Sequence, residues 1–392
     1  MTETRSLRVL GTPRIEAESP VVMVEPTPGQ RGPQRTLLTL ARYLAERRPL
    51  IVAVPEGFVS RGLRAQVAGA EVLPLPFHAS RPRSWAKGSL RLLSRLAEGP
   101  RPALLHANGL SALNLAAPAA RRLNVPVFVH FHASEIRPRS RGFVRLWERL
   151  GVRMSLFPVS DFGSGLLEGA GLRRLLRGVL PNPVEGTGAA RSQPHQPFRV
   201  GFVGSKNPVK GLHYFVRVAR SMQEEDVEWH LYGIDLEKRR TRYVETCIAE
   251  IEAAGLHGRI KWCGKVEDVA AAYASVDALL VPSQLESFSR VAVEGMASGL
   301  PVVAARVGAI PEVVLENVSG RLFDLDRPEE AAEQVRSIVR DPQLWTKLSS
   351  GAIEVARRFD IAEVGQLIER YYEEVLANGA RLDRNTRPST IS

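Results

Sequence analysis

The feature of this sequence that most constrains its fold is a regular alternation of short apolar runs with longer segments of helical periodicity. The first half of the chain has five apolar runs of strand length, at residues 21–24, 50–54, 103–106, 127–131 and 156–159. Segments with a helical pattern lie between or after them, at residues 33–47, 85–97, 111–123 and 161–169. Strands that are apolar on both faces and alternate with helices are typical of a parallel sheet covered by helices on both sides, so the sequence predicts an α/β fold.

The alternation is interrupted once, at residues 181–197, by a stretch rich in proline, glycine and polar residues. It then resumes with apolar runs at residues 199–203, 229–232, 259–263, 278–281 and 301–304. Helical patterns follow at residues 210–222, 238–254, 329–339, 343–358 and 361–376. A chain of 392 residues suits two domains rather than one core. We therefore predict domains at residues 1–185 and 186–377, a C-terminal helix at about 360–377 that packs back on the first domain, and a disordered tail at 378–392.

The charge is distributed unevenly between the two halves. Residues 1–185 hold 27 basic against 13 acidic residues, a net charge of +14, whereas the rest of the chain is net −3. A basic domain indicates an acidic partner, such as a phosphorylated acceptor or an anionic membrane face. No aromatic stacking platform accompanies the arginines, so we do not expect nucleic acid as a partner.

The remaining composition favours a chain that works in the cytoplasm. Residues 1–14 contain no apolar segment of signal-peptide length, and no apolar run reaches the roughly 20 residues of a membrane-spanning helix. Cys247 and Cys263, the two cysteines, form no disulfide framework and lack metal-site spacing. We expect a cytoplasmic protein with peripheral contact to the inner, anionic face of a membrane.

Residues 281–323 carry the strongest indication of chemistry. A strand ends at Pro282, and a helix begins near Ser289 after a short polar loop that contains Glu286. The free N–H groups of a helix start bind phosphate, and the helix dipole favours its negative charge. Glu294, inside the helix, could accept hydrogen bonds from ribose hydroxyls, while Glu286 could meet the sugar side of a nucleotide-sugar. Taken alone, two glutamates around a helix start are also typical of a solvated turn with a capping residue.

The spacing from Glu286 to Glu294 resembles the Glu-x7-Glu motif of the family 4 retaining glycosyltransferases, and the flanking "VPS", "EGMASGLPVVAA", "VGAIPEVV" and "SGRLF" also match. The resemblance implies the GT-B fold, in which two Rossmann-like domains face each other across a cleft. It implies transfer of a hexosyl group from a nucleoside diphosphate sugar, with no metal and no further cofactor. The residues that it places at the donor are Gly204, Ser205, Lys206, Lys210, Ser287, Phe288, Ser289, Arg290 and Glu294, with Glu286, Lys210 and His132 as catalytic residues.

The segment "VGSKNPVKGL" from Val203 is similar to the family's loop that closes on the donor diphosphate. Gly204 would let the backbone approach a phosphate, and Lys210 would neutralise the phosphate charge. Ser205 stands where the family usually has arginine. Lys206 is adjacent, but lysine lacks the bidentate fork of arginine.

The first domain departs further from the family pattern. In "EPTPGQRGPQRT", Gly32 matches the second glycine of the family's Gly-Gly loop, and Arg31 replaces the first. His132 follows the strand 127–131 at its carboxyl end, where ligands bind in open α/β sheets, and the family has a histidine near the donor sugar there. We expect His130 to point to the opposite face and to be structural, and His106, which also lies at a strand end, is a further candidate for the site.

Four arginines after His132 complete the predicted acceptor side, with Arg31 and Gly32: Arg137, Arg139, Arg141 and Arg145. They are interpreted either as a solvated loop and helix face or as a clamp for a phosphorylated or membrane-presented acceptor, with Arg137 and Arg139 preferred. Asp324 and Asp326 spell a metal-binding Asp-x-Asp, but we do not expect a metal there because the indicated fold does not depend on it. A nucleotide-sugar 2-epimerase and a non-catalytic nucleotide-sugar-binding scaffold remain as alternative functions.

Overall fold

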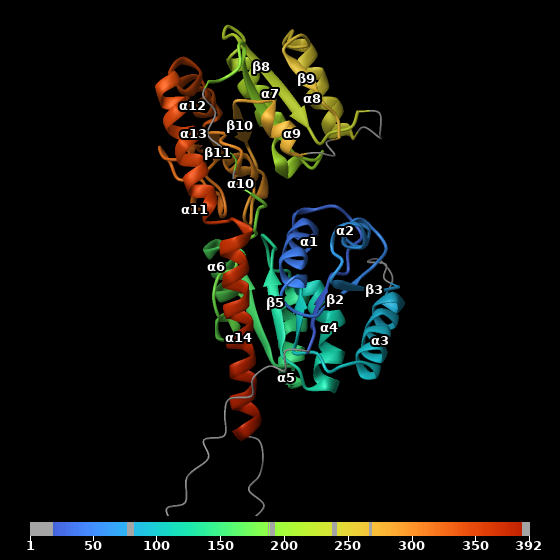
Figure 1. Ribbon diagram of the computed structural model, residues 1–392. Coiled ribbons are helices and arrows are strands. Elements are labelled where there is room, and N and C mark those ends of the chain that lie inside the picture. The colour runs from blue at the N-terminus through green and yellow to red at the C-terminus, as the bar shows by residue number, and fades with distance from the viewer. Residues whose placement is uncertain are drawn as a thin grey trace, which may run out of the picture.

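The computed structural model describes residues 19–76, 82–186, 188, 193–236, 241–265 and 269–385. The described chain forms two units, each built around a six-stranded sheet, and Figure 1 shows one unit above the other. No helix in the described part of the chain is long and apolar enough to cross a bilayer.

The first sheet has the order β3-β2-β1-β4-β5-β6, and all of its pairings are parallel. Its strands are β1 (Val21–Val24), β2 (Leu50–Val54), β3 (Ala70–Pro74), β4 (Leu104–Ala107), β5 (Val127–Phe131) and β6 (Met154–Pro158). The sequence analysis missed β3, which lies at the sheet edge and exposes Glu71, so that no continuous apolar run marks it. Central strands are easy to predict from sequence because both of their faces are apolar, whereas an edge strand with an exposed face lacks this pattern.

Helices cover both faces of the first sheet. One face packs against α3 (Pro82–Glu98), α4 (Leu110–Leu123), α5 (Pro138–Arg149) and α6 (Asp161–Gly169), in a core that contains Leu105 and Phe131. The other face packs against α1 (Gly32–Ala45) and α2 (Phe58–Gln66), in a core that contains Phe128 and Phe157. This three-layer arrangement is the one that the alternating pattern predicts.

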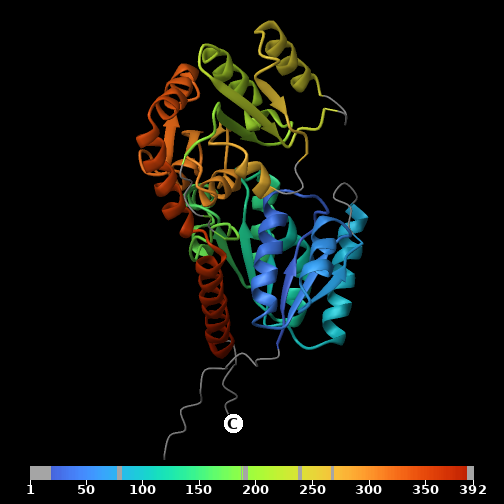
Figure 2. The ribbon, with the colours of Figure 1, turned by 45° about the horizontal axis from the view of Figure 1, so that its top comes forward.

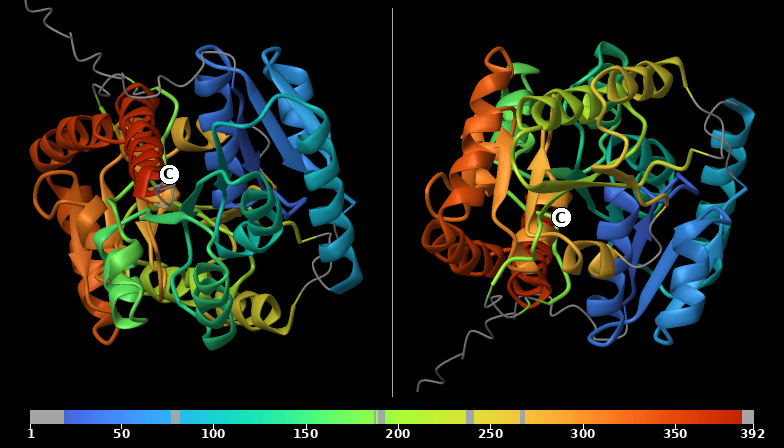
Figure 3. Two further views of the ribbon diagram at one scale, coloured as in Figure 1. Left: turned by 90° about the horizontal axis from the view of Figure 1, so that it is seen from below. Right: turned by 90° about the horizontal axis from the view of Figure 1, so that it is seen from above.

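The second sheet repeats the design with the order β12-β11-β10-β7-β8-β9. Its strands are β7 (Phe198–Val203), β8 (Val227–Tyr232), β9 (Ile260–Trp262), β10 (Ala278–Val281), β11 (Val302–Ala305) and β12 (Gly320–Phe323). Its helices are α7 (Leu212–Ser221), α8 (Arg242–Ala253), α9 (Val269–Ala274), α10 (Arg290–Ala297), α11 (Ile310–Val313), α12 (Pro328–Arg340) and α13 (Pro342–Arg357). Figure 3 shows, from below and from above, the helices arranged around both sheets.

The chain crosses between the two units twice, and the two crossings pair with each other. The Val184 N–H donates to the Phe359 carbonyl at 2.8 Å, and the Ile361 N–H donates to the Val184 carbonyl at 3.0 Å. The last helix, α14 (Ile361–Asn385), then returns to the first unit, where Ile368 and Tyr372 join the core beneath α1. Figure 2 shows α14 in red along the side of that unit.

Helix α14 is longer than the C-terminal helix predicted from the sequence and includes part of the predicted disordered tail. It continues past residue 376 to Asn385, so the segment expected to be disordered from residue 378 is helical as far as Asn385. The sequence there, Ala-Arg-Leu after a single glycine, contains good helix formers, and one glycine costs only about 1 kcal/mol. Residues 386–392 lie outside the described residues.

In each sheet the strand order reverses at one point, between β1 and β4 in the first sheet and between β7 and β10 in the second. In open α/β sheets, ligands bind outside the carboxyl ends of the strands at such switch points. The loops after β1, β4 and β5 and those after β7 and β10 carry the residues described next.

Candidate functional site

A cleft with a cavity of about 860 Å³ lies between the two units. Most of the residues singled out from the sequence line it: Arg31, Gly32, His132, Gly204, Ser205, Lys206, Lys210, Glu286, Ser287, Phe288, Ser289, Arg290 and Glu294. Arg137 and Arg139 do not line it. The cleft therefore brings together residues that are more than 250 positions apart in the chain, such as Gly32 and Glu294.

Lys210 and Glu286 form an ion pair at the donor side of the cleft. Lys210 Nζ lies 2.7 Å from Glu286 Oε1, and the Ser283 hydroxyl donates to the same oxygen at 2.9 Å. Gly211 makes this approach possible. Its φ is +77°, and a Cβ there would lie 1.9 Å from the Pro282 carbonyl oxygen, so only glycine fits between the two loops.

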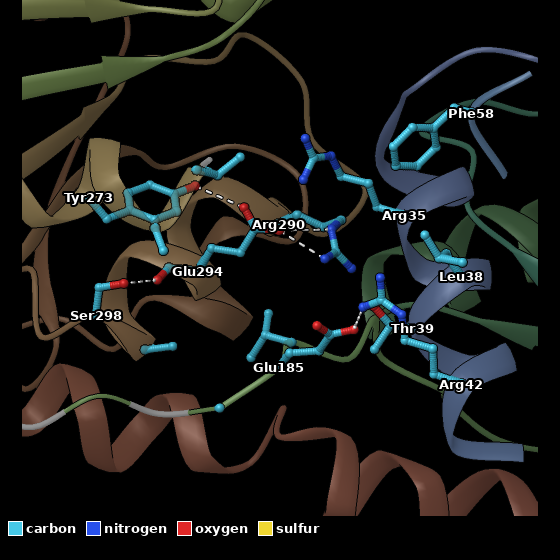
Figure 4. A pocket seen from close by; sticks show the side chains of 15 residues that line it. Arg35, Leu38, Thr39, Arg42, Phe58, Glu185, Tyr273, Arg290, Glu294 and Ser298 are labelled. Atoms are coloured by element: carbon cyan, nitrogen blue, oxygen red, sulfur yellow. Dashed lines mark hydrogen bonds and ion pairs between the residues drawn. The ribbon is translucent and has the colours of Figure 1, made fainter. Parts of the chain in front are cut away.

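Both carboxylate oxygens of Glu294 have partners. The Tyr273 hydroxyl donates to Oε2 at 2.9 Å, and Arg290 donates to Oε1 through Nε at 3.2 Å and Nη2 at 2.8 Å. Burial, and then the neighbouring Glu294 carboxylate, raise the pKa of Tyr273 well above its ordinary value, so the phenol keeps its proton and remains a donor. Figure 4 shows these contacts at a second cavity of about 270 Å³, which is also lined by Arg35 and Phe58.

Arg290 also joins the two units. Its Nη1 donates to the Thr36 hydroxyl of α1 at 3.0 Å and to the Pro183 carbonyl at 2.8 Å. The same side chain therefore positions Glu294 and contacts the opposite wall of the cleft. Only 12% of the side chain is exposed, and two charge-assisted hydrogen bonds from one guanidinium to Glu294 Oε1 hold the pair in place.

The loop before α10 makes contacts across the cleft. The Ser287 hydroxyl donates to the His132 carbonyl at 2.7 Å, and the Ser160 hydroxyl donates to the Ser287 carbonyl at 2.8 Å. Ser289, the residue before α10, has a φ of +71°, which is strained for a residue other than glycine. Phe288 is buried and packs edge-on against Phe359. Ser287 and Phe288 thus anchor the loop that presents the start of α10 to the cleft.

His132 is held by a chain of hydrogen bonds that the sequence analysis did not find. Asn108 Nδ2 donates to Glu25 Oε2 at 2.5 Å and to the Pro33 carbonyl at 3.1 Å, so Asn108 Oδ1 is left as an acceptor. This oxygen lies 2.8 Å from His132 Nε2, which therefore carries the proton. His132 Nδ1 is the acceptor and has no hydrogen-bond partner among the described residues.

The electrostatics of this chain keep the imidazole neutral. Burial lowers the pKa of His132 well below its ordinary value, and the neighbouring His130 and His106 rings lower it further. Burial raises the pKa of Glu25, although its hydrogen bonds from Asn108 and Thr27 oppose this. Glu25 follows β1 and Asn108 follows β4, so a search of every polar residue after a predicted strand would have found both.

The prediction that His130 faces away from His132 is wrong. Residues two positions apart on a strand share a face, and the two rings lie 4.1 Å apart. The structural role is consistent with the contacts, since His130 Nε2 donates to the Leu180 carbonyl at 2.8 Å. His106 is also buried, with Nδ1 at 2.6 Å from the Tyr372 hydroxyl of α14, and it does not reach the cleft.

Arg31 and Gly32 begin α1 beside Arg290. A Cβ on Gly32 would lie 3.5 Å from Arg290 Cδ, an ordinary contact. Arg31 has a φ of −113°, which any residue adopts, so the backbone accepts arginine in place of glycine at that position. Arg31 lines the cleft on the side of the first unit.

The remaining predicted residues lie elsewhere. Arg137 pairs with Glu135 on the surface, with 79% of its side chain exposed, and Arg139 lies in the first turn of α5. Asp324 binds Arg306 and Arg327. Across the residues that the structure describes, no three His, Cys, Asp or Glu side chains are grouped so as to hold a metal ion.

Comparisons with known proteins agree with this architecture. A family model described as "Glycosyl transferase 4-like domain" matches residues 31–182, and one described as "Glycosyl transferases group 1" matches residues 197–341, so together they match more than half of the chain.

Among curated proteins, the chain is 30% identical to D-inositol 3-phosphate glycosyltransferase of Corynebacterium glutamicum over 183 residues, 46% of this chain and 44% of the relative. It is 26% identical to sulfoquinovosyl transferase SQD2 of Arabidopsis thaliana over 374 residues, 86% of this chain and 70% of the relative. The chain thus aligns with just under half of the corynebacterial relative.

Solved structures show the same fold over nearly the whole chain. Anabaena Alr3699/HepE, solved in complex with UDP-glucose, matches with a TM-score of 0.76 and 22% identity over 91% of this chain and 99% of the other. Sucrose-phosphate synthase from Thermosynechococcus elongatus matches with a TM-score of 0.74 and 17% identity over 92% and 100%. The predicted α/β fold, with two Rossmann-like units and parallel sheets in the GT-B arrangement, is confirmed.

Proposed function

We propose that this chain, which belongs to the family 4-like glycosyltransferases, moves a hexosyl group from a nucleoside diphosphate sugar to an acceptor hydroxyl with retention of the anomeric configuration. The observation that carries the proposal is the cleft itself. Lys210, Glu286, Glu294 and the start of α10 lie on its second-unit wall, and neutral His132 lies on its first-unit wall. A cleft in which Lys210 and other basic side chains lie beside a helix start, with Glu286 and Glu294 nearby, suits a diphosphate with a sugar at each end.

The donor would bind mainly to the second unit. Its diphosphate would lie between the Gly204 loop, with Ser205 and Lys206, and the start of α10, next to Lys210. Its ribose hydroxyls would donate to Glu294, with Arg290 fixing that carboxylate from the far side. Glu286 would accept hydrogen bonds from hydroxyls of the transferred sugar through Oε2, because Lys210 and Ser283 occupy Oε1.

In the reaction, the bond between the anomeric carbon and the leaving phosphate oxygen breaks, and the bond to the acceptor oxygen forms on the same face. The acceptor proton passes to the leaving phosphate, so the products are a glycosylated acceptor and a nucleoside diphosphate. Negative charge grows on the leaving phosphate as the bond breaks, and a preorganised ammonium and helix N–H groups stabilise it. We assign the ammonium to Lys210, already held by Glu286 in the cleft.

His132 would position the sugar rather than remove a proton from the acceptor. Its low pKa keeps the ring neutral, and Asn108 fixes the tautomer with the proton on Nε2. We place the neutral ring against the transferred sugar, where His132 lines the cleft. Arg31 and Gly32 would border the acceptor at the same wall.

We further propose an acidic or membrane-presented acceptor. The net charge of +14 over residues 1–185, with Arg137 and Arg139 beyond His132, would attract a phosphate group. The name of the corynebacterial relative, an inositol 3-phosphate glycosyltransferase, supports a phosphorylated acceptor. The proposed mechanism needs no cofactor besides the donor.

The donor half of the proposal is tested by thermal unfolding with a panel of nucleoside diphosphates and their sugars. A ligand at 100 times its dissociation constant stabilises the folded state by about 2.7 kcal/mol, which raises the melting temperature measurably. We expect one base to give this shift and Glu294→Ala to abolish it. Glu316→Ala is the matched control, because Glu316 also pairs with an arginine in the second unit but lies outside the cleft.

The reaction is tested by incubating the stabilising nucleotide-sugar with acceptors and determining the anomeric configuration of the product by NMR. Retention supports the proposal, and inversion rules out the same-face mechanism. An epimerised donor formed without acceptor would identify a 2-epimerase instead. No shift with any nucleotide would favour a protein that has lost donor binding through Ser205.

A further inference from the structure

Helix α5 and the residue that caps its C-terminal end, Leu150, carry an exposed apolar stripe on the first unit. Phe143, Leu146 and Leu150 keep exposed fractions of 47%, 45% and 36%, and they are three of the seven large apolar side chains exposed in the described part of the chain. Positions three and four residues apart share one side of a helix, and Val144, on another side, is buried in the core. Clustering of this kind marks a surface that contacts another apolar phase, because isolated apolar side chains are scattered on ordinary surfaces.

The stripe is bordered by cationic groups. Arg139 and Arg149 are exposed on the same helix, and neither pairs with another residue that the structure describes. Glu148, the one acidic residue of α5, is neutralised by Arg174. The helix therefore presents apolar side chains within a positively charged border, the pattern of helices that lie at a membrane interface.

A groove of about 590 Å³ separates α5 from α6 on a neighbouring side of α5, and none of the three apolar residues lines it. Arg141 and Arg145, four residues apart, both line it, together with Ile136 and Leu166. Arg141 Nε is buried and has no hydrogen-bond partner among the described residues, and Arg145 makes one weak hydrogen bond, from Nη2 to the Ala170 carbonyl at 3.4 Å. Buried guanidinium donors without partners are costly, so the groove suits an anion that accepts several hydrogen bonds.

We infer that this side of α5 docks on an anionic phospholipid bilayer, with Phe143, Leu146 and Leu150 in the interface and a lipid phosphate in the Arg141–Arg145 groove. Charge complementarity selects this occupant, since residues 1–185 have a net charge of +14 and the groove is cationic. Apolar and cationic groups are here on one helix, and a bilayer surface offers both counterparts. The inference goes beyond the transfer reaction and stands independently of the donor chemistry.

The location of α5 gives the docking a consequence for the cleft. The helix begins at Pro138, six residues after His132, so one short segment joins the cleft wall to the docking surface. In Figure 1, α5 and α6 belong to the lower unit. Docking would hold the acceptor-side unit on the membrane and leave the second unit free to exchange nucleotides.

The test is co-sedimentation of the purified full-length protein with vesicles of phosphatidylcholine alone and of phosphatidylcholine mixed with phosphatidylglycerol. The protein should sediment with the mixed vesicles, and added salt should weaken this binding. The triple variant Phe143→Ser/Leu146→Ser/Leu150→Ser should lower the partition coefficient at least about tenfold. Arg141→Gln/Arg145→Gln should lower it by about fivefold per arginine. Leu90→Ser, which changes a 65% exposed leucine on α3, should leave it unchanged.

Absence of binding to the mixed vesicles, equal binding to both vesicle types, or an equal loss in Leu90→Ser would overturn the inference. Self-association that the triple variant abolishes, with no vesicle binding, would assign the stripe to a second copy of the chain. Circular dichroism and the nucleotide-induced thermal shift, measured on the same variants, show that the fold and donor site are intact. A failure of membrane docking is therefore distinguishable from a failure of the proposed transferase function.

Discussion

Acidification from pH 7.5 to pH 5.5 should destabilise the first unit through its buried histidines. Burial lowers the pKa of His130 to about 4 and lowers those of His106 and His132 well below the ordinary value. In the unfolded chain each histidine gains a proton near pH 6.5, whereas in the folded chain each stays neutral. Unfolding therefore takes up protons below pH 6.5, and the free energy of unfolding falls as the pH falls.

The size of the effect follows from these pKa values. His130, whose pKa is about 4 in the folded chain, stays neutral over this range and accounts for about 1.4 kcal/mol of the stability lost between pH 7.5 and pH 5.5, and His106 and His132 act in the same direction. Glu25 acts in the opposite direction. Burial raises its pKa, so the folded state keeps its proton to a higher pH, and its contribution to stability grows as the pH falls.

A single substitution isolates the contribution of His130 to the pH dependence of stability. In His130→Gln, the amide can donate to the Leu180 carbonyl as Nε2 of the imidazole does, but it does not titrate. The loss of stability between the two pH values should be about 1.4 kcal/mol smaller in the variant. The measurement is urea unfolding at both pH values, read by hydrogen exchange in peptides that contain β5, so that it reports on the first unit. An equal pH dependence in both proteins would refute the argument that burial keeps His130 neutral.

Two further predictions concern the cleft. Replacing Lys210 by methionine should lower kcat for transfer by about 10²–10³-fold, because the leaving phosphate loses one preorganised charge-stabilising group. The control Lys261→Met, which changes a lysine outside the cleft, should leave kcat unchanged. In steady-state assays, a change confined to KM would argue against a role of Lys210 in stabilising the leaving phosphate. Glu312 accepts the Asp161 and Phe162 N–H groups across the units at 2.8 and 2.7 Å, so Glu312→Gln should weaken the contact by about 1–2 kcal/mol and raise donor hydrolysis relative to transfer. An unchanged ratio of hydrolysed donor to glycosylated acceptor would show that this contact does not help to exclude water from the cleft.

The local pattern of the sequence determined the type of fold and much of the donor side. Strands such as Val21–Val24 and Ala278–Val281 are apolar on both faces, and this property alone requires helices on both sides of a sheet. The Glu286–Glu294 spacing spans one loop and one helix start, so short-range geometry carries it into the structure. The edge strand Ala70–Pro74 escaped prediction because a half-exposed strand has no such pattern. The orientation of His130 was available from the two-residue period and was misjudged.

Tertiary structure alone decided the first-unit wall of the cleft. Glu25, Asn108 and His132 follow three different strands, and only the sheet order β1-β4-β5 brings their side chains into one hydrogen-bonded chain. The contact of Arg290 with Thr36 joins residues 254 positions apart and depends on how the two units close. The periodicity of a sequence indicates which face of a helix or strand is buried, but it does not indicate which other element packs against that face. The sequence therefore indicated the residues of the second-unit wall, whereas the strand order and the packing of the units decided which residues meet on the first-unit wall and across the cleft.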